Sequence, residues 1–317
     1  MGYDEEATAE LDREETVEAI ASALIRAGCE IDVIGSIRRL AARLAAGDRW
    51  DLVFNIAEGF YGSAREAQVP ALLEAYEIPC TFSDAMTLAI AQHKAYAKLV
   101  VASRGVRTPS YLLIDDASSF DFARFSNLSY PLFVKPACEG TSKGISLASL
   151  VVGPDELSER LAALSAPFDG PMLVEEYLPG REVTVGIAGC GDRTRSLGVA
   201  EIILHDSADG AIYSYRNKEE CEHRVAYVPV EGELADEAAA IAIAAWNALG
   251  CRDAGRVDLR QDRDGRLSFI EVNPLSGLHP THSDLPILCA FSGMSYDKLI
   301  ATILTEANTR VATSSDR

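Results

Sequence analysis

Residues 255–274 read GRVDLRQDRDGRLSFIEVNP, and they predict two strands joined by a tight turn. The segments on both sides of DRDG alternate apolar and polar residues, and DRDG itself is typical of a turn. Side chains two residues apart in a strand share a face, so Arg256 lies beside Asp258 and Glu271 beside Asn273. Carboxylate and amide oxygens are the ligands that suit Mg²⁺ when it bridges nucleotide phosphates. The alternative is an ordinary polar hairpin face exposed to solvent, which this stretch alone leaves equally open.

A second informative stretch is KPACEGTSKG, residues 135–144, which follows the strand-like PLFVKP. Glycines let backbone N–H groups approach an anion, hydroxyl groups add donors, and lysines add positive charge. The stretch does not match the G-x-x-x-x-G-K-[ST] pattern of a P-loop. It therefore predicts either a loop that covers phosphates or, as the simpler alternative, a turn at the surface.

Two further motifs flank these. In LVEEYLPGRE, residues 173–182, the backbone from Glu175 to Leu178 could hydrogen-bond a purine edge, while Glu182 meets a ribose or a metal. The alternative is a strand end with solvated acids. In NPLSGLHPTHSDLP, residues 273–286, small residues and hydroxyl groups could form a pocket for a carboxylate. For His279 in that loop, an ordinary structural role is favoured over a functional one.

Composition excludes several classes of function. The 317 residues carry 48 acids against 29 Lys and Arg, a net charge of -19, which disfavours nucleic acid and anionic membrane as partners. No apolar run has the length of a membrane span, and the acidic N-terminus lacks the features of a signal peptide. The seven cysteines are scattered without zinc spacing, which indicates reduced thiols and a cytoplasmic protein. Lysine is scarce, which makes the position of each one informative.

Hydrophobic periodicity predicts an α/β chain whose C-terminal half is α+β. Helices and short strands alternate in the first part and imply a parallel sheet, although no buried strand opens it. The elements expected there are a helix at 14–27, a strand at 30–35, a helix at 36–47, a strand at 51–56, a helix at 65–77, a strand at 78–82 and a helix at 88–105. The elements expected afterwards are a helix at 154–164, antiparallel strands at 181–189, 196–204, 211–215 and 224–230, a helix at 233–249, the hairpin, and a helix at 296–307 with a frayed tail.

In their order and spacing the four motifs resemble the ATP-grasp fold, and specifically the D-alanine–D-alanine ligase family. The resemblance runs from about Asp51 to Leu304 and is strongest in PLFVKPACEGTSKGIS, LVEEYLPGREVTVGI, CRDAGRVDLRQDRDGRLSFIEVNPLSGL and HSDLP with GMSYDKLI. It implies an N-terminal parallel α/β domain at 1–84 that lacks its first strand. It also implies a central ATP-grasp subdomain at 85–172 and a C-terminal one at 173–317.

The resemblance also implies roles for individual residues. The residues expected to bind ATP are Lys94, Lys135, Thr141, Ser142, Gly144, Glu175, Glu176, Leu178, Glu182 and Lys218. The expected metal ligands are Asp258, Glu271 and Asn273, and the catalytic group comprises Arg256, Thr141 and Lys218. The expected substrate residues are Glu10, Glu58, Glu219, Gly277 and Ser283, with Glu14 and Glu15 competing for the role of Glu10.

The activity implied is that of an ATP-dependent carboxylate–amine ligase that forms a dipeptide or similar amide through an acyl phosphate. Its cofactors would be ATP and Mg²⁺, with two ions expected and Mn²⁺ as an alternative, and the chain would form a homodimer. Its other partners would be a small-molecule carboxylate and a small-molecule amine. The family's His-Gly pair is here Glu58-Gly59, and its tyrosine after the late lysine is Glu219. These charge reversals suggest a substrate with a cationic or hydroxylated group. The alternatives are conjugation of an amino acid to a non-peptide acceptor, and nucleotide binding without catalysis.

Overall fold

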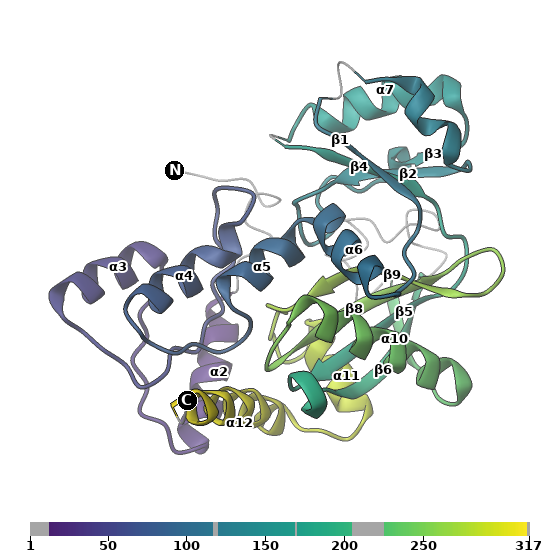
Figure 1. The fold of residues 1–317 in the computed structure, drawn as a ribbon. Coiled ribbons are helices and arrows are strands. Elements are labelled where there is room, and N and C mark those ends of the chain that lie inside the picture. Colours follow the sequence, from purple (N-terminus) through teal and green to yellow (C-terminus); the bar gives the residue numbers. More distant parts are fainter. Residues whose placement is uncertain (1–12, 117–119, 169, 205–224, 316–317) are drawn as a thin grey trace.

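The computed structural model describes residues 13–116, 120–168, 170–204 and 225–315. In Figure 1 the N-terminal helices form a lobe on the left, and two antiparallel sheets form the rest of the molecule. A four-stranded sheet lies at the top of this view, with a five-stranded sheet below it. The helices that connect the N-terminal lobe to the sheets lie between these parts, so three units meet near the centre of the molecule.

The N-terminal lobe contains the helices that the sequence predicts. Helix α2 spans Glu14–Arg26, α3 spans Ile37–Ala46, and a short 3-10 turn η1 (Arg65–Ala67) leads into α4 (Gln68–Ala75). Helix α3 ends at Gly47, which has a φ of 101°, a left-handed conformation that favours glycine at a helix C-terminus. The apolar faces of α3 and α4 pack together around buried leucines, so this lobe has its own small core.

The parallel pairing expected in this lobe is less extensive than predicted among the described residues. Segments 30–35, 51–56 and 78–82 are extended, yet they form only one isolated parallel bridge, between Val53 and Cys80. A strand exists only where its backbone meets a hydrogen-bonding neighbour. Residues 28–38 and 48–61 instead line the same hollow, which extends to α2 and α12, and they form no ladder across it. The expected absence of a first strand concerns residues that lie partly outside the described ones.

The single helix expected at 88–105 is two helices. Helix α5 spans Ala85–Gln92 and α6 spans Lys94–Ser103, and the backbone of His93 between them is extended, with φ of −95° and ψ of 95°. The break redirects the chain, so that the N–H group of Lys94 donates to the carbonyl of Ala137 at 2.9 Å. The start of α6 therefore contacts the residue that directly follows the strand predicted at 131–136.

The four-stranded sheet has the order β1-β4-β2-β3, and every pair is antiparallel. Its strands are β1 (Tyr111–Ile114), β2 (Leu132–Pro136), β3 (Leu150–Val151) and β4 (Met172–Glu176). Helix α7 (Pro154–Ser165), which confirms the predicted helix, packs on β2 and buries leucines against it. The turns η2 (Phe122–Asn127) and η3 (Leu147–Ser149) complete this unit. The glycine-rich loop leaves β2 at the edge that faces the larger sheet.

The five-stranded sheet has the order β7-β6-β5-β8-β9 and is also antiparallel throughout. Its strands are β5 (Glu182–Ala188), β6 (Arg195–Leu204, preceded by η4, Gly191–Arg193), β7 (Val225–Pro229), β8 (Ala254–Gln261) and β9 (Leu267–Asn273). Helix α10, Glu233–Leu249 as predicted, packs on it with a fully buried Trp246. A Cβ atom at Gly255 would lie 2.7 Å from the Trp246 ring, so β8 requires glycine there. The strand expected at 211–215 lies outside the described residues.

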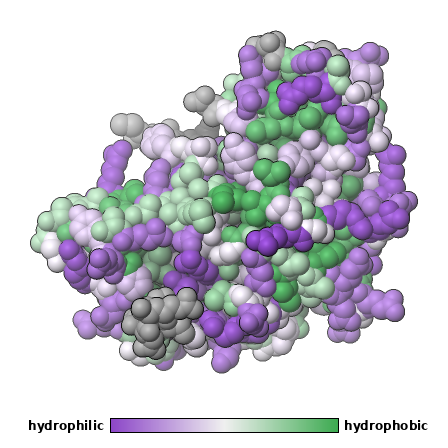
Figure 2. Space-filling model, viewed as in Figure 1, coloured by the Kyte–Doolittle hydropathy of each residue, from purple (hydrophilic) through white to green (hydrophobic). Residues whose placement is uncertain are grey.

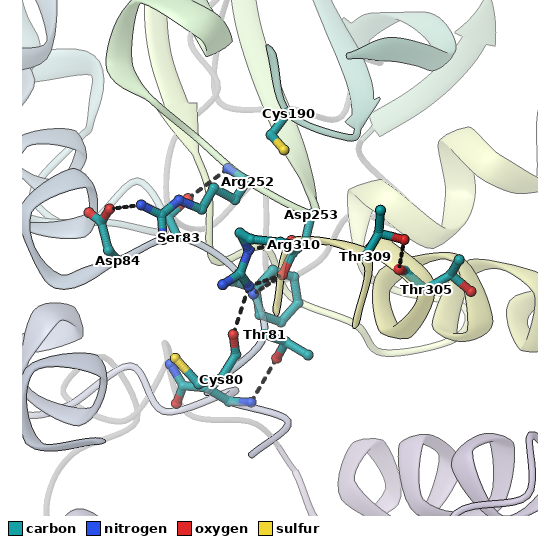
Figure 3. A network of polar contacts seen from close by, with 12 residues as sticks. Cys80, Thr81, Ser83, Asp84, Cys190, Arg252, Asp253, Thr305, Thr309 and Arg310 are labelled. Carbon is teal, nitrogen blue, oxygen red and sulfur yellow. Dashed lines mark hydrogen bonds and ion pairs between the residues drawn. The ribbon is translucent and has the colours of Figure 1, made fainter. Parts of the chain in front are cut away.

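Helices α11 (Asp284–Phe291) and α12 (Tyr296–Ser315) complete the chain, and α12 is longer than predicted. The tail expected to fray contains Arg310, which binds the carboxylate of Asp253 at 2.9 Å and the carbonyl of Cys80 at 2.8 Å (Figure 3). These contacts hold the last turns of the helix against two other parts of the fold. Among the described residues, no single helix is long and apolar enough to cross a membrane. The bent pair of α11 and residues 296–312, at 109°, reaches that length and composition together.

The surface has both hydrophilic and more apolar regions. Figure 2 shows hydrophilic side chains around the hairpin between β8 and β9, and a more apolar band over the N-terminal lobe near α3, α4 and α5. Helices α3 and α4 contribute residues to the lining of the hollow described above, so the apolar character of this lobe extends from its interior to its surface.

Candidate active site

A cleft lies between the two sheets, and most of the predicted ATP and metal residues line it. The four-stranded sheet contributes the ends of β2 and β4, and the five-stranded sheet contributes β5, β8 and β9. The lining residues are Phe133, Lys135, Ser142, Ile145, Glu175, Glu176, Tyr177, Leu178, Glu182, Ile202, Arg256, Asp258, Arg260, Ile270 and Glu271.

The polar face of the hairpin forms as the sequence predicts. Arg256 pairs with Asn273 across the two strands, and Asp258 pairs with Glu271. Asp258 Oδ1 accepts a hydrogen bond from Thr184 Oγ1 at 2.7 Å, and Asp258 Oδ2 accepts one from Asn273 Nδ2 at 3.3 Å. Register therefore brings two carboxylates and an amide together at one wall of the cleft.

These three side chains fit a Mg²⁺ ion that bridges phosphates. Such an ion takes one or two protein carboxylates and completes its shell with phosphate oxygens and water. The described residues contain no cluster of three or more His, Cys, Asp or Glu side chains that could hold a metal unaided. The set formed by Asp258, Glu271 and Asn273 thus suits an ion that arrives with a nucleotide better than an ion held by the protein alone.

Lysines approach this wall from the opposite side. Lys94 Nζ, at the start of α6, lies 3.4 Å from Glu271 Oε2, and it also donates to the carbonyl of Glu139. Lys135 Nζ, at the end of β2, lies 2.7 Å from Glu175 Oε1. Burial lowers the pKa of Lys135, but the negative charges of Glu175, Glu271 and Glu182 and the hydrogen bond to Glu175 together outweigh it, and the pKa is raised. Lys135 therefore stays charged in the cleft.

Sequence reasoning missed Lys98, which lies one turn after Lys94 on α6. Its Nζ is 3.0 Å from Glu175 Oε2, and its side chain is completely buried. Burial raises the pKa of Glu175, yet the charges of Lys135 and Lys98 more than compensate, so that pKa is lowered. The sequence does contain a signal for Lys98: it lies four residues after Lys94, and this spacing places both lysines on one helix face.

The segment after β4 forms the other end of the cleft. The N–H groups of Glu176 and Tyr177 donate to the carbonyls of Ser110 and Pro131, at 2.9 and 3.0 Å. A purine edge at these two residues would therefore meet their carbonyl oxygens. Glu182 Oε2 accepts a hydrogen bond from Arg260 Nη1 at 2.8 Å, and burial raises the pKa of Glu182.

The glycine-rich loop takes an unusual backbone path. Thr141 and Ser142 have φ values of 48° and 56°, and Gly144 has a φ of 71°. A Cβ atom at Gly144 would lie 2.6 Å from the Phe168 ring, so the loop requires glycine at that position. Ser142 lines the cleft, whereas Thr141 and Gly144 shape the loop behind it.

Arg256 stands between two carboxylates. Its Nη2 lies 3.2 Å from Asp258 Oδ2, and its Nη1 contacts Asp284, the first residue of α11. Asp284 also accepts a hydrogen bond from the Tyr227 hydroxyl. Both Asp284 and Tyr227 were missed, and the sequence contains no signal that joins them to Arg256.

Gly277 and Ser283 meet in the loop before α11. Ser283 Oγ accepts a hydrogen bond from the N–H group of His279 at 2.8 Å, and a Cβ atom at Gly277 would lie 2.8 Å from that oxygen. His279 Nδ1 in turn lies 3.3 Å from the N–H groups of Thr281 and His282, as an ordinary loop residue would. The loop therefore presents a serine hydroxyl next to the carboxylate that holds Arg256.

Other predicted substrate residues lie elsewhere. Glu58 lines the hollow of the N-terminal lobe, and it is absent from the lining of the cleft between the sheets. Arg65 in the same segment donates to the carbonyl of Cys138 at 3.1 Å, so the N-terminal lobe contacts the glycine-rich loop. Glu10, Lys218 and Glu219 lie outside the described residues.

Known proteins match this chain over most of its length. A family model described as D-ala D-ala ligase C-terminus matches residues 101–305. The D-alanine–D-alanine ligase of Bordetella petrii is 32% identical over 294 residues, which cover 92% of this chain and 86% of that protein. The structure of the D-alanine–D-alanine ligase from Bacillus anthracis complexed with ATP matches with a TM-score of 0.77 at 23% identity, covering 99% of this chain and 97% of that chain. The VanG D-Ala:D-Ser ligase from Enterococcus faecalis matches with a TM-score of 0.67 at 25% identity, over 81% of this chain and 73% of that chain.

Proposed function

The chain belongs to the D-alanine–D-alanine ligase family, and from that premise we propose which residues perform each step and which substrates it joins. It is an ATP-dependent ligase with the ATP-grasp fold that forms a C–N bond between small amino acid substrates. The family uses ATP, generally with Mg²⁺. The observation that carries the proposal is the cleft in which Lys135, Arg256 and the carboxylates of Asp258 and Glu271 face one another.

We assign the nucleotide to this cleft. The ammonium groups of Lys94 and Lys135 would bind its phosphates, and the loop with Thr141, Ser142 and Gly144 would cover them. The segment from Glu175 through Leu178 would frame the adenine, with Glu182 at the ribose. Lys218 is proposed as a further phosphate ligand and catalytic residue. The N-terminal division at 1–84 and the subdomains at 85–172 and 173–317 would then meet at the reacting atoms.

Asp258, Glu271 and Asn273 would hold the Mg²⁺ that accompanies ATP. When bound, the ion supplies positive charge that offsets the charge developing on the transferred phosphoryl group. We further propose two ions, with Mn²⁺ as a substitute.

In the first step a carboxylate oxygen of the donor substrate attacks the γ-phosphorus, the bond to the β-phosphate oxygen breaks, and ADP leaves. In the second step the amine nitrogen of the acceptor attacks the acyl carbon. The bond to phosphate then breaks and the nitrogen loses a proton. Arg256 would stabilise the oxyanion of the tetrahedral intermediate, a kind of contact whose loss typically costs about 3 kcal/mol. Closure of the loop at 135–144 would exclude water from the acyl phosphate.

The substrates we propose are two amino acids, with D-alanine in both positions as the first pair to test. The relatives named above act on D-alanine and, in one case, D-serine, which supports a D-amino acid. Glu10, Glu58 and Glu219 are proposed for the donor side, and Gly277 with Ser283 for the acceptor carboxylate. We also propose that the enzyme is a cytoplasmic homodimer.

The experiment is a screen of substrate pairs read by phosphate release, followed by mass spectrometry of the product. Phosphate should appear only when a suitable carboxylate and amine are both supplied with Mg-ATP. Release with D-alanine and a product of the mass of the dipeptide would support the assignment. Turnover with another pair and none with D-amino acids would remove D-alanine as substrate while leaving the ligase activity in place.

A further inference from the structure

Three charged side chains are buried together beneath the cleft, and one of them has no role in the mechanism above. Lys98, Lys135 and Glu175 are 0%, 3% and 4% exposed. The carboxylate of Glu175 contacts one lysine with each oxygen, Lys135 at 2.7 Å through Oε1 and Lys98 at 3.0 Å through Oε2. Buried ions are costly unless they are paired, so this arrangement requires a physical reason.

The position of Lys98 separates it from the ligand. Lys135 and Glu175 line the cleft, whereas Lys98 does not. It lies behind Glu175 on α6, where its Nζ also donates to the carbonyl of Phe269 at 3.3 Å. Helix α6 packs on β9 of the larger sheet, while Glu175 belongs to the smaller one, so this contact also joins the two sheets.

The charges in this group do not cancel. Two ammonium groups and one carboxylate leave an excess of one positive charge at the floor of the cleft. If Lys98 were neutral, Glu175 and Lys135 would form a closed pair, and Lys135 could reach a phosphate only by leaving its counter-ion. With Lys98 in place, Glu175 keeps a counter-ion when Lys135 turns toward an anion.

We propose that Lys98 is a positioning residue that neutralises Glu175 from behind and thereby releases Lys135 to the phosphates of ATP. The inference rests on the proposed function, because it takes the cleft to be the ATP site. It assigns to Lys98 no contact with substrate or nucleotide. Its effect passes through Glu175, and this connection makes it testable.

The test is a double-mutant cycle in which the affinity for ATP with Mg²⁺ is measured by titration calorimetry. Lys98→Met keeps the length of the side chain and removes the charge. Glu175→Gln removes the carboxylate, and the double variant restores the excess of one positive charge. Lys298→Met, at an exposed lysine of α12, is the matched control for the substitution itself. Thermal unfolding of each variant confirms that it is folded.

We expect Lys98→Met to weaken ATP binding by about tenfold or more when Glu175 is present, since Lys135 is then the only counter-ion left to that carboxylate and is held away from the phosphates. In the Glu175→Gln background the same substitution should change binding by less than about threefold, and Lys298→Met should change nothing. Equal losses in both backgrounds would overturn the proposal, because they would show that Lys98 acts through packing alone. If the unaltered protein bound no ATP, the proposed function itself would fail.

A pH profile gives a second readout. Burial lowers the pKa of Lys98 to about 8, against the attraction of Glu175. The charged and titratable groups that face it are Glu175, Lys135 and Glu271, and Tyr111 lies near Glu175. ATP affinity should therefore fall as the pH rises through about 8, and this alkaline limb should be absent in Lys98→Met. An identical limb in that variant would count against the proposal.

Discussion

Replacing Arg310 with methionine should destabilise the whole fold, although the residue is far along the last helix. Arg310 Nη2 lies 2.9 Å from Asp253 Oδ2 and 2.8 Å from the carbonyl of Cys80, so it joins α12 to the start of β8 and to the N-terminal lobe (Figure 3). Asp253 is completely buried. Without the guanidinium group, its carboxylate keeps the N–H group of Phe82, at 2.7 Å, as a donor, but loses its nearest positive charge.

The magnitude follows from these contacts. Removing one partner of a buried ion pair typically costs about 3–5 kcal/mol, because the other charge stays buried. Arg310 has 19% of its side chain exposed and Phe82 still donates to Asp253, so we expect a cost at or just below the low end of that range, about 2–3 kcal/mol. At about 2–4 °C per kcal/mol for a chain of this size, Tm should fall by about 4–12 °C.

The assay is thermal unfolding monitored by calorimetry at several pH values. Burial raises the pKa of Asp253. A carboxyl group whose pKa is higher in the folded protein favours folding below its unfolded pKa, and that contribution is lost as the pH rises through the folded pKa. Arg310→Met raises this pKa further, so its penalty should shrink toward acidic pH.

Two variants make the result decisive. Arg310→Met combined with Asp253→Asn should recover part of the lost stability, since no charge is left buried. Arg26→Met breaks the exposed pair of Arg26 with Asp297, which also joins α12 to another helix, and should shift Tm little or not at all. If Arg310→Met changed Tm as little as Arg26→Met, the reasoning about Asp253 would be refuted.

Three further predictions concern the active site. Arg256→Ala should lower turnover by about 100-fold or more while ATP binding is retained; unchanged turnover would reject the catalytic assignment. Gly144→Ala should raise the KM for ATP, because its Cβ would meet the Phe168 ring at 2.6 Å and its φ is 71°; an unchanged KM would show that the loop accommodates the methyl group. Treatment with EDTA should abolish phosphate release, and Mg²⁺ should restore it; activity that persists without divalent ions would contradict the assignment of Asp258 and Glu271.

The hairpin face was predictable because everything that builds it is local. Arg256, Asp258, Glu271 and Asn273 lie in two strands joined by a short turn, so alternation and register suffice to place them. The pairing of the extended segments in the N-terminal lobe was not predictable, for the opposite reason. Val53 pairs with Cys80, which lies far along the chain, and residues 30–35 form no β-bridge with any described residue. An apolar, extended segment becomes a strand only if another segment pairs with its backbone, and its own sequence does not specify that partner.

Helices show the same division between local and distant causes. The boundaries of α10 follow from periodicity and from Gly250 after its last turn. No proline or glycine marks the break at His93 in the sequence. The break is accompanied by the contact of Lys94 with Ala137, which joins two separate units of the fold. Lys98 was overlooked because a lysine on a helix is usually solvated. Only the position of β4 in the folded structure shows that the charge of Lys98 is buried against Glu175.

The electrostatics of the cleft suggest why so acidic a chain can bind a polyphosphate. Each proposed phosphate-binding or catalytic cation of the described residues is paired with an acid of the same site: Lys94 with Glu271, Lys135 with Glu175, and Arg256 with Asp258. Two of these acids are proposed ligands of Mg²⁺. An ion that binds Asp258 and Glu271 would therefore satisfy the carboxylate that now holds Lys94 and one of the two that hold Arg256, so that Lys94 would be released toward the nucleotide while Arg256 keeps its contact with Asp284. Binding of the metal and ATP would thus replace ion pairs within the protein by contacts with the ligands. This exchange requires the acidic residues as much as the lysines.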